Sequence, residues 1–336
     1  MASFIFNRLA AVAIGIGAIV TPRAQVDVVP GSQSAVHVRV HVRGRVIKPG
    51  AESMVPIPHL MVTLHRVGSD TAGPVDSMLT LANGHYQFTY YRSGAADAVY
   101  FTAASYSGVA YFSAPFKADA PPTSDDAEIT VFDTTSKPVP IDVRGRHLVV
   151  GALDSHGDRR ITEVFELSND SSVTKVASGD TPSDASWSVE IPEAAKHPEV
   201  PEGDIPAGAV SFTKGRALVY APMGPGVKQL VVSYLLPESQ FPWALTVHEP
   251  ASLLEVLLEE PTATVSGATF KAMGPVPLGG RSFQRFLGNN VAANTVVRIG
   301  VPDSPHPISP WFMAGLTVLI GGAMVGTLAY ALRRRR

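Results

Sequence analysis

The middle of the chain alternates between apolar and polar residues with a period of two. Residues 36–43 show this most clearly, because four valines share one face while His37, Arg39, His41 and Arg43 occupy the other. A period of two places successive side chains on opposite faces of a strand, so we predict a half-buried strand here. Similar short runs are predicted to be strands at 60–67, 85–90, 99–104, 146–153, 161–167, 187–191, 216–220, 228–235, 243–248, 262–265 and 295–301.

Turn sequences separate these runs, for example Asn83-Gly84 and His156-Gly157. The 336 residues include 29 Gly and 28 Pro, and a helix interior loses about 1 kcal/mol for each Gly and about 3 for each Pro. A mostly helical protein is therefore excluded, and we predict an all-β fold of tandem β-sandwich domains. Within the interior, only residues 251–259 have a helix-like pattern, and their leucines suit a buried strand equally well.

The N-terminus has the pattern of an export signal. Arg8 precedes an apolar run of 12 residues from Leu9 to Val20. As a helix this run spans about 18 Å, short of the roughly 30 Å hydrocarbon core, so we expect a secretory signal segment over residues 1–25. The alternative is a retained N-terminal anchor that includes residues 3–6.

The C-terminus has the pattern of a membrane anchor. The 22 residues from Trp311 to Leu332 carry no charge, and four arginines follow them. This length is sufficient for a transmembrane helix, with Trp311 and Tyr330 as interfacial anchors and the arginines on the cytoplasmic side. We therefore expect a single-pass protein of the cytoplasmic membrane whose bulk lies on the periplasmic or extracytoplasmic side. The residues expected to anchor it are Trp311, Tyr330, Arg333, Arg334, Arg335 and Arg336.

Small residues occupy one face of this predicted helix, namely Gly315, Gly322, Gly326 and Ala329. Small residues let a neighbouring helix approach closely, so this face predicts a partner within the membrane. The alternative is that Gly is simply frequent in spanning helices.

Composition predicts the domain boundaries, because proline-rich polar stretches interrupt the strand pattern. The predicted order is a signal segment at 1–25, a first sandwich at 26–117, a linker at 118–126, a second sandwich at 127–238, a third small β domain at 239–302, a stalk at 303–310, the transmembrane helix at 311–332 and an arginine tail at 333–336.

The first predicted sandwich resembles a known module. The segments are Gly44-Arg45-Val46, then Val62-Thr63-Leu64 preceded by Pro56, then Asn83-Gly84-His85-Tyr86-Gln87-Phe88, and finally Tyr106-Ser107-Gly108. Together they resemble the carboxypeptidase regulatory-like domain of the transthyretin-like sandwich class, over about residues 36–116. The resemblance implies a non-catalytic accessory domain. The chain departs from that pattern by an insert at 68–77.

Composition excludes several kinds of chemistry. The chain has no cysteine, which removes disulfides, thiolate metal sites and cysteine nucleophiles. The formal net charge of −2 gives no electrostatic reason to expect nucleic acid as a partner. His37 and His41 would lie about 13 Å apart along a strand, too far to share a metal ion. We expect no metal, cofactor or catalytic residue.

Two polar clusters offer candidate chemistry. The sequence Asp154-Ser155-His156-Gly157-Asp158 holds the residue types of a triad or a calcium loop, but it lies between two predicted strands, where a hairpin loop requires the same residues. The second cluster consists of four carboxylates, and a pair of them could form a glycosidase dyad. Because no aromatic subsites surround them, we interpret the cluster as a solvated face formed by Glu249, Glu255, Glu259 and Glu260.

Aromatic residues are concentrated in the first predicted sandwich. Tyr86, Phe88 and Tyr90 share one strand face, and most aromatics of this domain are expected to fill its core. The others would form an exposed platform for a sugar or a contact site for a protein. The favoured hypothesis is a non-enzymatic, membrane-anchored accessory or scaffold subunit that docks on integral-membrane proteins, for example of a respiratory or photosynthetic complex. The alternative is a surface module for glycan binding or adhesion.

Overall fold

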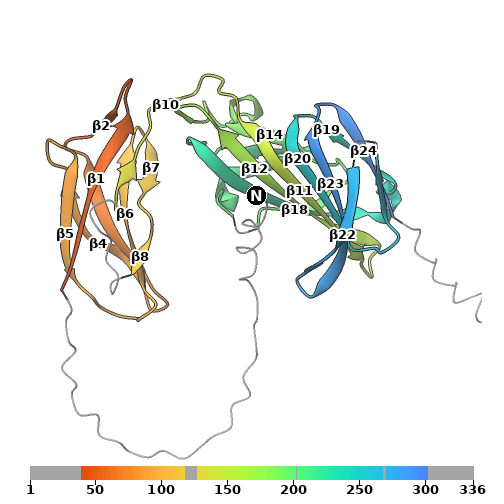
Figure 1. The fold of residues 1–336 in the computed structure, drawn as a ribbon, viewed down its shortest axis with the longest axis horizontal. Coiled ribbons are helices and arrows are strands. Elements are labelled where there is room, and N and C mark those ends of the chain that lie inside the picture. The colour runs from red at the N-terminus through yellow and green to blue at the C-terminus, as the bar shows by residue number, and fades with distance from the viewer. Residues whose placement is uncertain (1–38, 118–126, 202, 268–269, 302–336) are drawn as a thin grey trace, which may run out of the picture.

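The computed structural model describes residues 39–117, 127–201, 203–267 and 270–301 (Figure 1). In these ranges the fold is all-β, as predicted. The helical elements there are short 3-10 turns at Pro182–Asp184, Ala207–Ala209 and Glu238–Gln240. None of the helices in the described ranges is long and apolar enough to cross a membrane. The predicted signal segment, stalk, anchor helix and arginine tail lie outside the described residues.

The N-terminal part is a sandwich of two sheets. Its core contains Val40 and Val42 from one sheet and Val62 and Leu64 from the other, as the period-two alternation predicts. The first sheet contains β2 (Met54–Pro56), β1 (Arg39–Pro49) and β5 (His85–Tyr91), with β9 (Ile129–Thr130) parallel to β1; the second contains β4 (Ala72–Leu79), β3 (Met61–Val67), β6 (Val99–Tyr106) and β7 (Val109–Phe112), with β8 (Phe116–Lys117) beside β6.

The end of the first sandwich corrects the predicted boundary. Ala127, Ile129 and Val131 are fully buried in the same core, although we expected the second sandwich to begin at residue 127. The Tyr86 hydroxyl donates a hydrogen bond to the carbonyl of Ala127 and contacts Thr102 Oγ1 at 2.7 Å. Residues on both sides of 118–126 therefore belong to one sandwich, because the first sheet is completed by the parallel β9.

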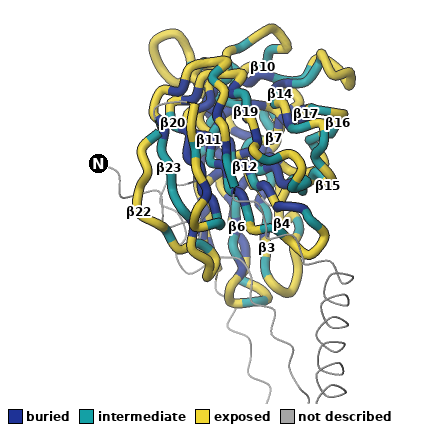
Figure 2. The backbone as a smooth tube through the Cα atoms, turned by 90° about the vertical axis from the view of Figure 1, so that its right-hand side faces the viewer, coloured by how far each residue is buried: buried dark blue, intermediate teal, exposed yellow. Residues whose placement is uncertain are grey.

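The C-terminal part packs one large sheet against two small ones (Figure 1). Buried and exposed stretches alternate along its strands (Figure 2). In the described ranges the large sheet has seven strands and each small sheet has three. The large sheet contains, in order, β15 (Lys196–Glu199), β18 (Gly226–Pro237), β12 (Asp158–Asn169), β11 (Asp142–Leu153), β20 (Ala251–Leu258), β23 (Arg281–Val291) and β22 (Phe270–Leu278); the small sheets contain β14 (Trp187–Glu190), β17 (Arg216–Val219) and β16 (Val210–Thr213), and β19 (Trp243–Val247), β24 (Thr295–Gly300) and β21 (Thr264–Ser266).

The expected third domain at 239–302 is not a separate unit, and this corrects the second predicted boundary. β20 pairs in parallel with β11, so Val143 lies opposite Ala251 in the centre of the large sheet. One core cluster also extends from Val143 to Ile299. The ambiguous segment 251–259 is thus a buried strand, because it fills the centre of the sheet between β11 and β23.

The two sandwiches are joined by a short parallel pair, β10 (Thr134–Thr135) with β13 (Thr174–Lys175). Tyr111 of the first sandwich contacts Thr174 Oγ1 at 2.8 Å, and Lys48 pairs with Asp133 at 2.9 Å. The predicted insert at 68–77 contributes to β4, which pairs with β3 and extends the second sheet of the first sandwich.

Candidate functional site

The first sandwich presents an uncharged outer surface on its second sheet. We call it the uncharged face. On β3, β4, β6 and β7 it carries no Asp, Glu, Lys or Arg, while Lys117 of β8 lies opposite Val99 at its edge. Met61, Leu79 and Phe112 are about half exposed there, at 51%, 49% and 60%. The residues that the register of β3, β4, β6 and β7 places on the uncharged face are Met61, Thr63, His65, Val67, Ala72, Pro74, Ser77, Leu79, Val99, Phe101, Ala103, Ser105, Ala110 and Phe112.

Aromatic rings occupy the centre of this face. The His65 and Phe101 rings stack with centroids 5.2 Å apart, and Phe112 meets Phe101 edge-on at 5.8 Å. These three rings come from three adjacent strands, β3, β6 and β7. Their clustering makes a continuous apolar surface rather than isolated exposed side chains.

The opposite outer surface of the same sandwich is polar. On β1 it carries Arg39, His41, Arg43 and Arg45, and on β5 their partners include Gln87 and Thr89. Arg45 forms an ion pair with Glu128 at 2.6 Å, and His41 Nδ1 contacts Thr89 Oγ1 at 2.9 Å. The two outer surfaces of one sandwich thus differ sharply in polarity.

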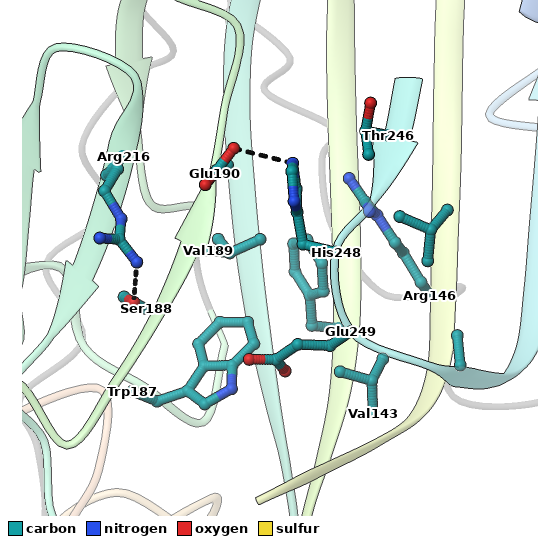
Figure 3. Close-up of a pocket in the computed structure, with 13 residues that line it drawn as sticks. Val143, Arg146, Trp187, Ser188, Val189, Glu190, Arg216, Thr246, His248 and Glu249 are labelled. Atoms are coloured by element: carbon teal, nitrogen blue, oxygen red, sulfur yellow. Dashed lines mark hydrogen bonds and ion pairs between the residues drawn. The ribbon is translucent and has the colours of Figure 1, made fainter. Parts of the chain in front are cut away.

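The second sandwich contains a groove between its two small sheets. One wall is β14 and the other is β19 with the residues that follow it, while Val143 and Phe165 of the large sheet form the floor (Figure 3). The inner part of this groove has a volume of about 80 Å³, and a more open part of about 480 Å³ continues along β19. We call this feature the strand-edge groove.

Ionisable side chains line the strand-edge groove. Glu190 on one wall forms an ion pair with His248 on the other at 2.8 Å, and Figure 3 shows this pair spanning the groove. Burial raises the pKa of Glu249, and the nearby Asp142 charge adds to the rise. The indole N–H of Trp187 and the side chain of His248 partly offset it. Trp187 is 8% exposed, and in the described part of the chain its N–H makes no hydrogen bond of ordinary length.

Arg146, which lines the inner part of the groove, belongs to a buried ion pair. Arg146 donates to Glu163 Oε2 from its Nε at 2.8 Å, and both side chains are at most 6% exposed. Tyr234 donates its hydroxyl proton to Glu163 Oε1 at 2.7 Å, and the Arg146 guanidinium lies 5.1 Å from the centre of the Phe165 ring. Every charge of this pair is therefore hydrogen-bonded, which is the condition for a stable buried ion pair.

Three of the four glutamates do not form the solvated face that we expected, whereas Glu249 is exposed. Glu255 is 5% exposed and pairs with His147 at 2.6 Å and Arg285 at 2.5 Å. Glu259 pairs with Arg281, Glu260 pairs with the fully buried Arg159, and Glu249 lies in the strand-edge groove against an aromatic residue. The error arose because the chain brings Arg159, Trp187 and Arg285 to this strand from distant positions.

The 154–158 cluster is a hairpin loop between β11 and β12, as predicted. Asp154 Oδ1 accepts hydrogen bonds from the backbone N–H of His156 and Asp158, and Gly157 has a φ of 80°. These bonds lower the pKa of Asp154. In the described ranges no group of three or more His, Asp or Glu side chains is arranged to hold a metal ion.

The predicted aromatic core is confirmed, since Tyr86, Phe88, Tyr90 and Tyr100 are all at most 5% exposed. The predicted membrane-packing and anchoring residues, 315, 322, 326, 329–330, 311 and 333–336, lie outside the described residues. Comparison of the sequence with protein-family models gives no match, and comparison with curated proteins gives none either.

Sequence reasoning missed the strand-edge groove. Trp187 and Glu249 are 62 positions apart in the sequence and meet only because β14 and β19 lie over the same part of the large sheet. A usable signal existed for the buried ion pair: in the run Ile161 to Leu167, the alternation places Glu163 among the inward apolar positions.

Proposed function

We propose that this chain is a non-enzymatic, single-pass accessory or scaffold subunit, anchored in the cytoplasmic membrane, whose exported β region docks on integral-membrane proteins of a larger complex. The uncharged face carries the proposal. Exposed apolar patches of this kind, continuous over four strands, are typical of interaction sites. The charge-free segment 311–332 with its arginine cluster supports a location next to such partners.

The polarity of the face indicates the partner. Met61, Leu79 and Phe112 expose apolar surface to water, and on β3, β4, β6 and β7 no charged side chain of the face would have to lose its hydration on docking. A partner surface that is itself uncharged and apolar therefore fits, because burying apolar area contributes about 25 cal/mol per Å². The polar surface with Arg39, Arg43 and Arg45 remains in solvent in this arrangement.

Size analysis of native membranes solubilised in a mild detergent tests the proposal. We expect the chain in a particle much larger than its own 35.5 kDa, in fixed ratio to its companions. The double substitution Met61→Glu/Phe112→Glu should release it, because each carboxylate would be buried without a partner. Thr89→Glu on the opposite surface is the matched control and should leave the particle intact. A free monomer of the unsubstituted chain would refute the proposal.

Glycan binding or adhesion is the second candidate. The His65, Phe101 and Phe112 rings at the centre of the uncharged face favour it, since sugars stack on exposed aromatic rings. A glycan array probed with the full chain in lipid nanodiscs tests this function. Binding that is lost in Phe112→Ala would favour the glycan function over protein docking, while no binding to any glycan would remove it.

A further inference from the structure

The strand-edge groove lies where one more β-strand would join the two small sheets. We propose that it receives an extended segment of another polypeptide, which adds one β-strand between β14 and β19. This inference concerns a different surface from the uncharged face and does not depend on the membrane anchor. Failure of one proposal therefore leaves the other standing.

Two unpaired strand edges face each other across the groove. In the described ranges β14 is the last strand of the sheet β14-β17-β16, and β19 is the last strand of the sheet β19-β24-β21. Both line the same groove, and no sheet hydrogen bond joins them within those ranges (Figure 3). An edge strand directs alternate backbone N–H and C=O groups away from its neighbour, so each wall offers a row of hydrogen-bonding groups.

The numbers of strands in the two layers of the sandwich support one inserted strand. The large sheet has seven described strands, whereas the opposing layer is divided into three and three. The side chains of Glu190 and His248 reach from the two walls and meet at 2.8 Å, so the gap is bridged by two side chains. Paired strands lie about 4.8 Å apart, so one inserted strand needs about twice that separation between the two walls.

The groove also defines the direction of the added strand. Trp187, at the start of β14, faces Glu249 beyond the end of β19, whereas Pro192 shares the open part of the groove with Trp243 at the start of β19. The two walls therefore run in opposite directions. An inserted strand pairs antiparallel with one wall and parallel with the other, as in peptide recognition by β-augmentation.

The inner groove defines the side chains that fit. Its volume of about 80 Å³ is about half of the 150 Å³ cavity that admits benzene, so it suits one aliphatic side chain of about valine size. Val143, Phe165 and Ala251 line it with apolar surface, and Arg146, whose charge is paired with Glu163, lines it as well. Glu249 and the Trp187 N–H offer an acceptor and a donor beside it, which suits a neighbouring threonine or lysine. β19 has five residues, so the paired stretch is about 17 Å long.

Hydrogen–deuterium exchange of the full chain in lipid nanodiscs tests the inference. The probe is the peptide Thr-Val-Lys-Val-Thr-Val-Lys-Val, and the matched control has proline at its fourth position, which removes one N–H and disfavours strand pairing. With the probe, amides in β14 and β19 should exchange about tenfold more slowly, and with the control they should not change. The outer edges β16 and β21 should be unaffected by either peptide.

A blocking experiment uses the absence of cysteine from the chain. Ala244→Cys places a single thiol on β19 in the open groove, where a bulky maleimide should abolish the protection given by the probe. The same label at Ser266→Cys, on the far edge of that small sheet, should leave the protection intact.

Three results would overturn the inference. The first is unchanged exchange with the probe, and the second is equal slowing at all strand edges. The third is slow exchange of β14 and β19 amides before any peptide is added, which would mean that a segment of this chain already fills the groove.

Discussion

The Glu163→Gln substitution is expected to destabilise the second sandwich strongly. It preserves the shape of the side chain but removes the negative charge that Arg146 faces. Arg146 is buried, with only 5% of the residue exposed. Arg146 donates two hydrogen bonds to Glu163 Oε2, one of them at 2.8 Å from Nε. After the substitution a buried cation remains without a counter-charge.

The free energy of unfolding is expected to fall by about 3–5 kcal/mol, the usual cost of removing one partner of a buried ion pair. Within that cost, Tyr234 keeps an acceptor at 2.7 Å only if the new amide presents its oxygen to the hydroxyl. With a urea m-value of about 2 kcal/mol/M, a loss of about 4 kcal/mol lowers the unfolding midpoint by about 2 M.

Urea unfolding of the full chain in nanodiscs, followed by near-UV circular dichroism, measures this shift. The informative control is the triple variant Arg146→Met/Glu163→Leu/Tyr234→Phe, which removes the ion pair and the hydroxyl together. Replacing a buried ion pair by apolar residues of similar volume is often neutral or stabilising, so its midpoint should not fall more than about 0.5 M below that of the unsubstituted chain. Our reasoning is refuted if the triple variant is as unstable as Glu163→Gln, or if Glu163→Gln unfolds at the original midpoint.

Three further predictions follow from other contacts. Burial disfavours the charged form of His147, but the Glu255 and Glu166 carboxylates outweigh this effect and raise the pKa of the imidazole. His147→Gln should therefore lower the melting temperature more at about pH 6 than at about pH 9, where the unsubstituted imidazole has lost its proton. An equal loss at the two pH values would contradict this prediction. Gly44→Ala would place a methyl carbon 2.3 Å from the Ala127 carbonyl oxygen, so it should lower the free energy of unfolding by about 1–3 kcal/mol and speed amide exchange at 127–131. Gly73→Ala, whose new methyl carbon meets no atom within 4 Å, should not change that exchange. Gly322→Ile/Gly326→Ile should reduce recovery of the chain with its membrane companions, while Met324→Ile, on the opposite face of the predicted helix, should not; equal recovery of both would remove the helix-packing prediction.

Local patterns in the sequence predicted most individual strands. The alternation in β1 and β5 identified four core residues, because every second side chain of such a strand points into the core and the others point to solvent. These residues are Val40, Val42, Tyr86 and Phe88. β22 was missed since it is an edge strand that contains Gly274 and Pro275 and buries little of its surface.

Pairing between distant strands was not predictable in the same way. The position of β9 in the first sandwich and of β20 in the second decided both domain boundaries, and neither strand differs in composition from a strand of the neighbouring unit. The strand-edge groove follows the same logic, because an unpaired edge depends on which strands lie next to it rather than on its own residues. Sequence therefore predicted many of the strands and their buried faces, but it missed β4, β22 and β23 and did not predict the sheets that the strands form.

The parallel pairing of β11 with β20 has a consequence for how the chain folds. β11 forms a hairpin with β12 at once, but its other edge remains open until β20 has been made more than a hundred residues later. Closing so long a loop is entropically costly and slows folding. During that interval the inward face of β11, with Leu148 and Val150, is only partly covered. A chain shortened before Ala251 would lack β20 and expose this edge permanently, so the β region is expected to need protection from aggregation until its last strands arrive.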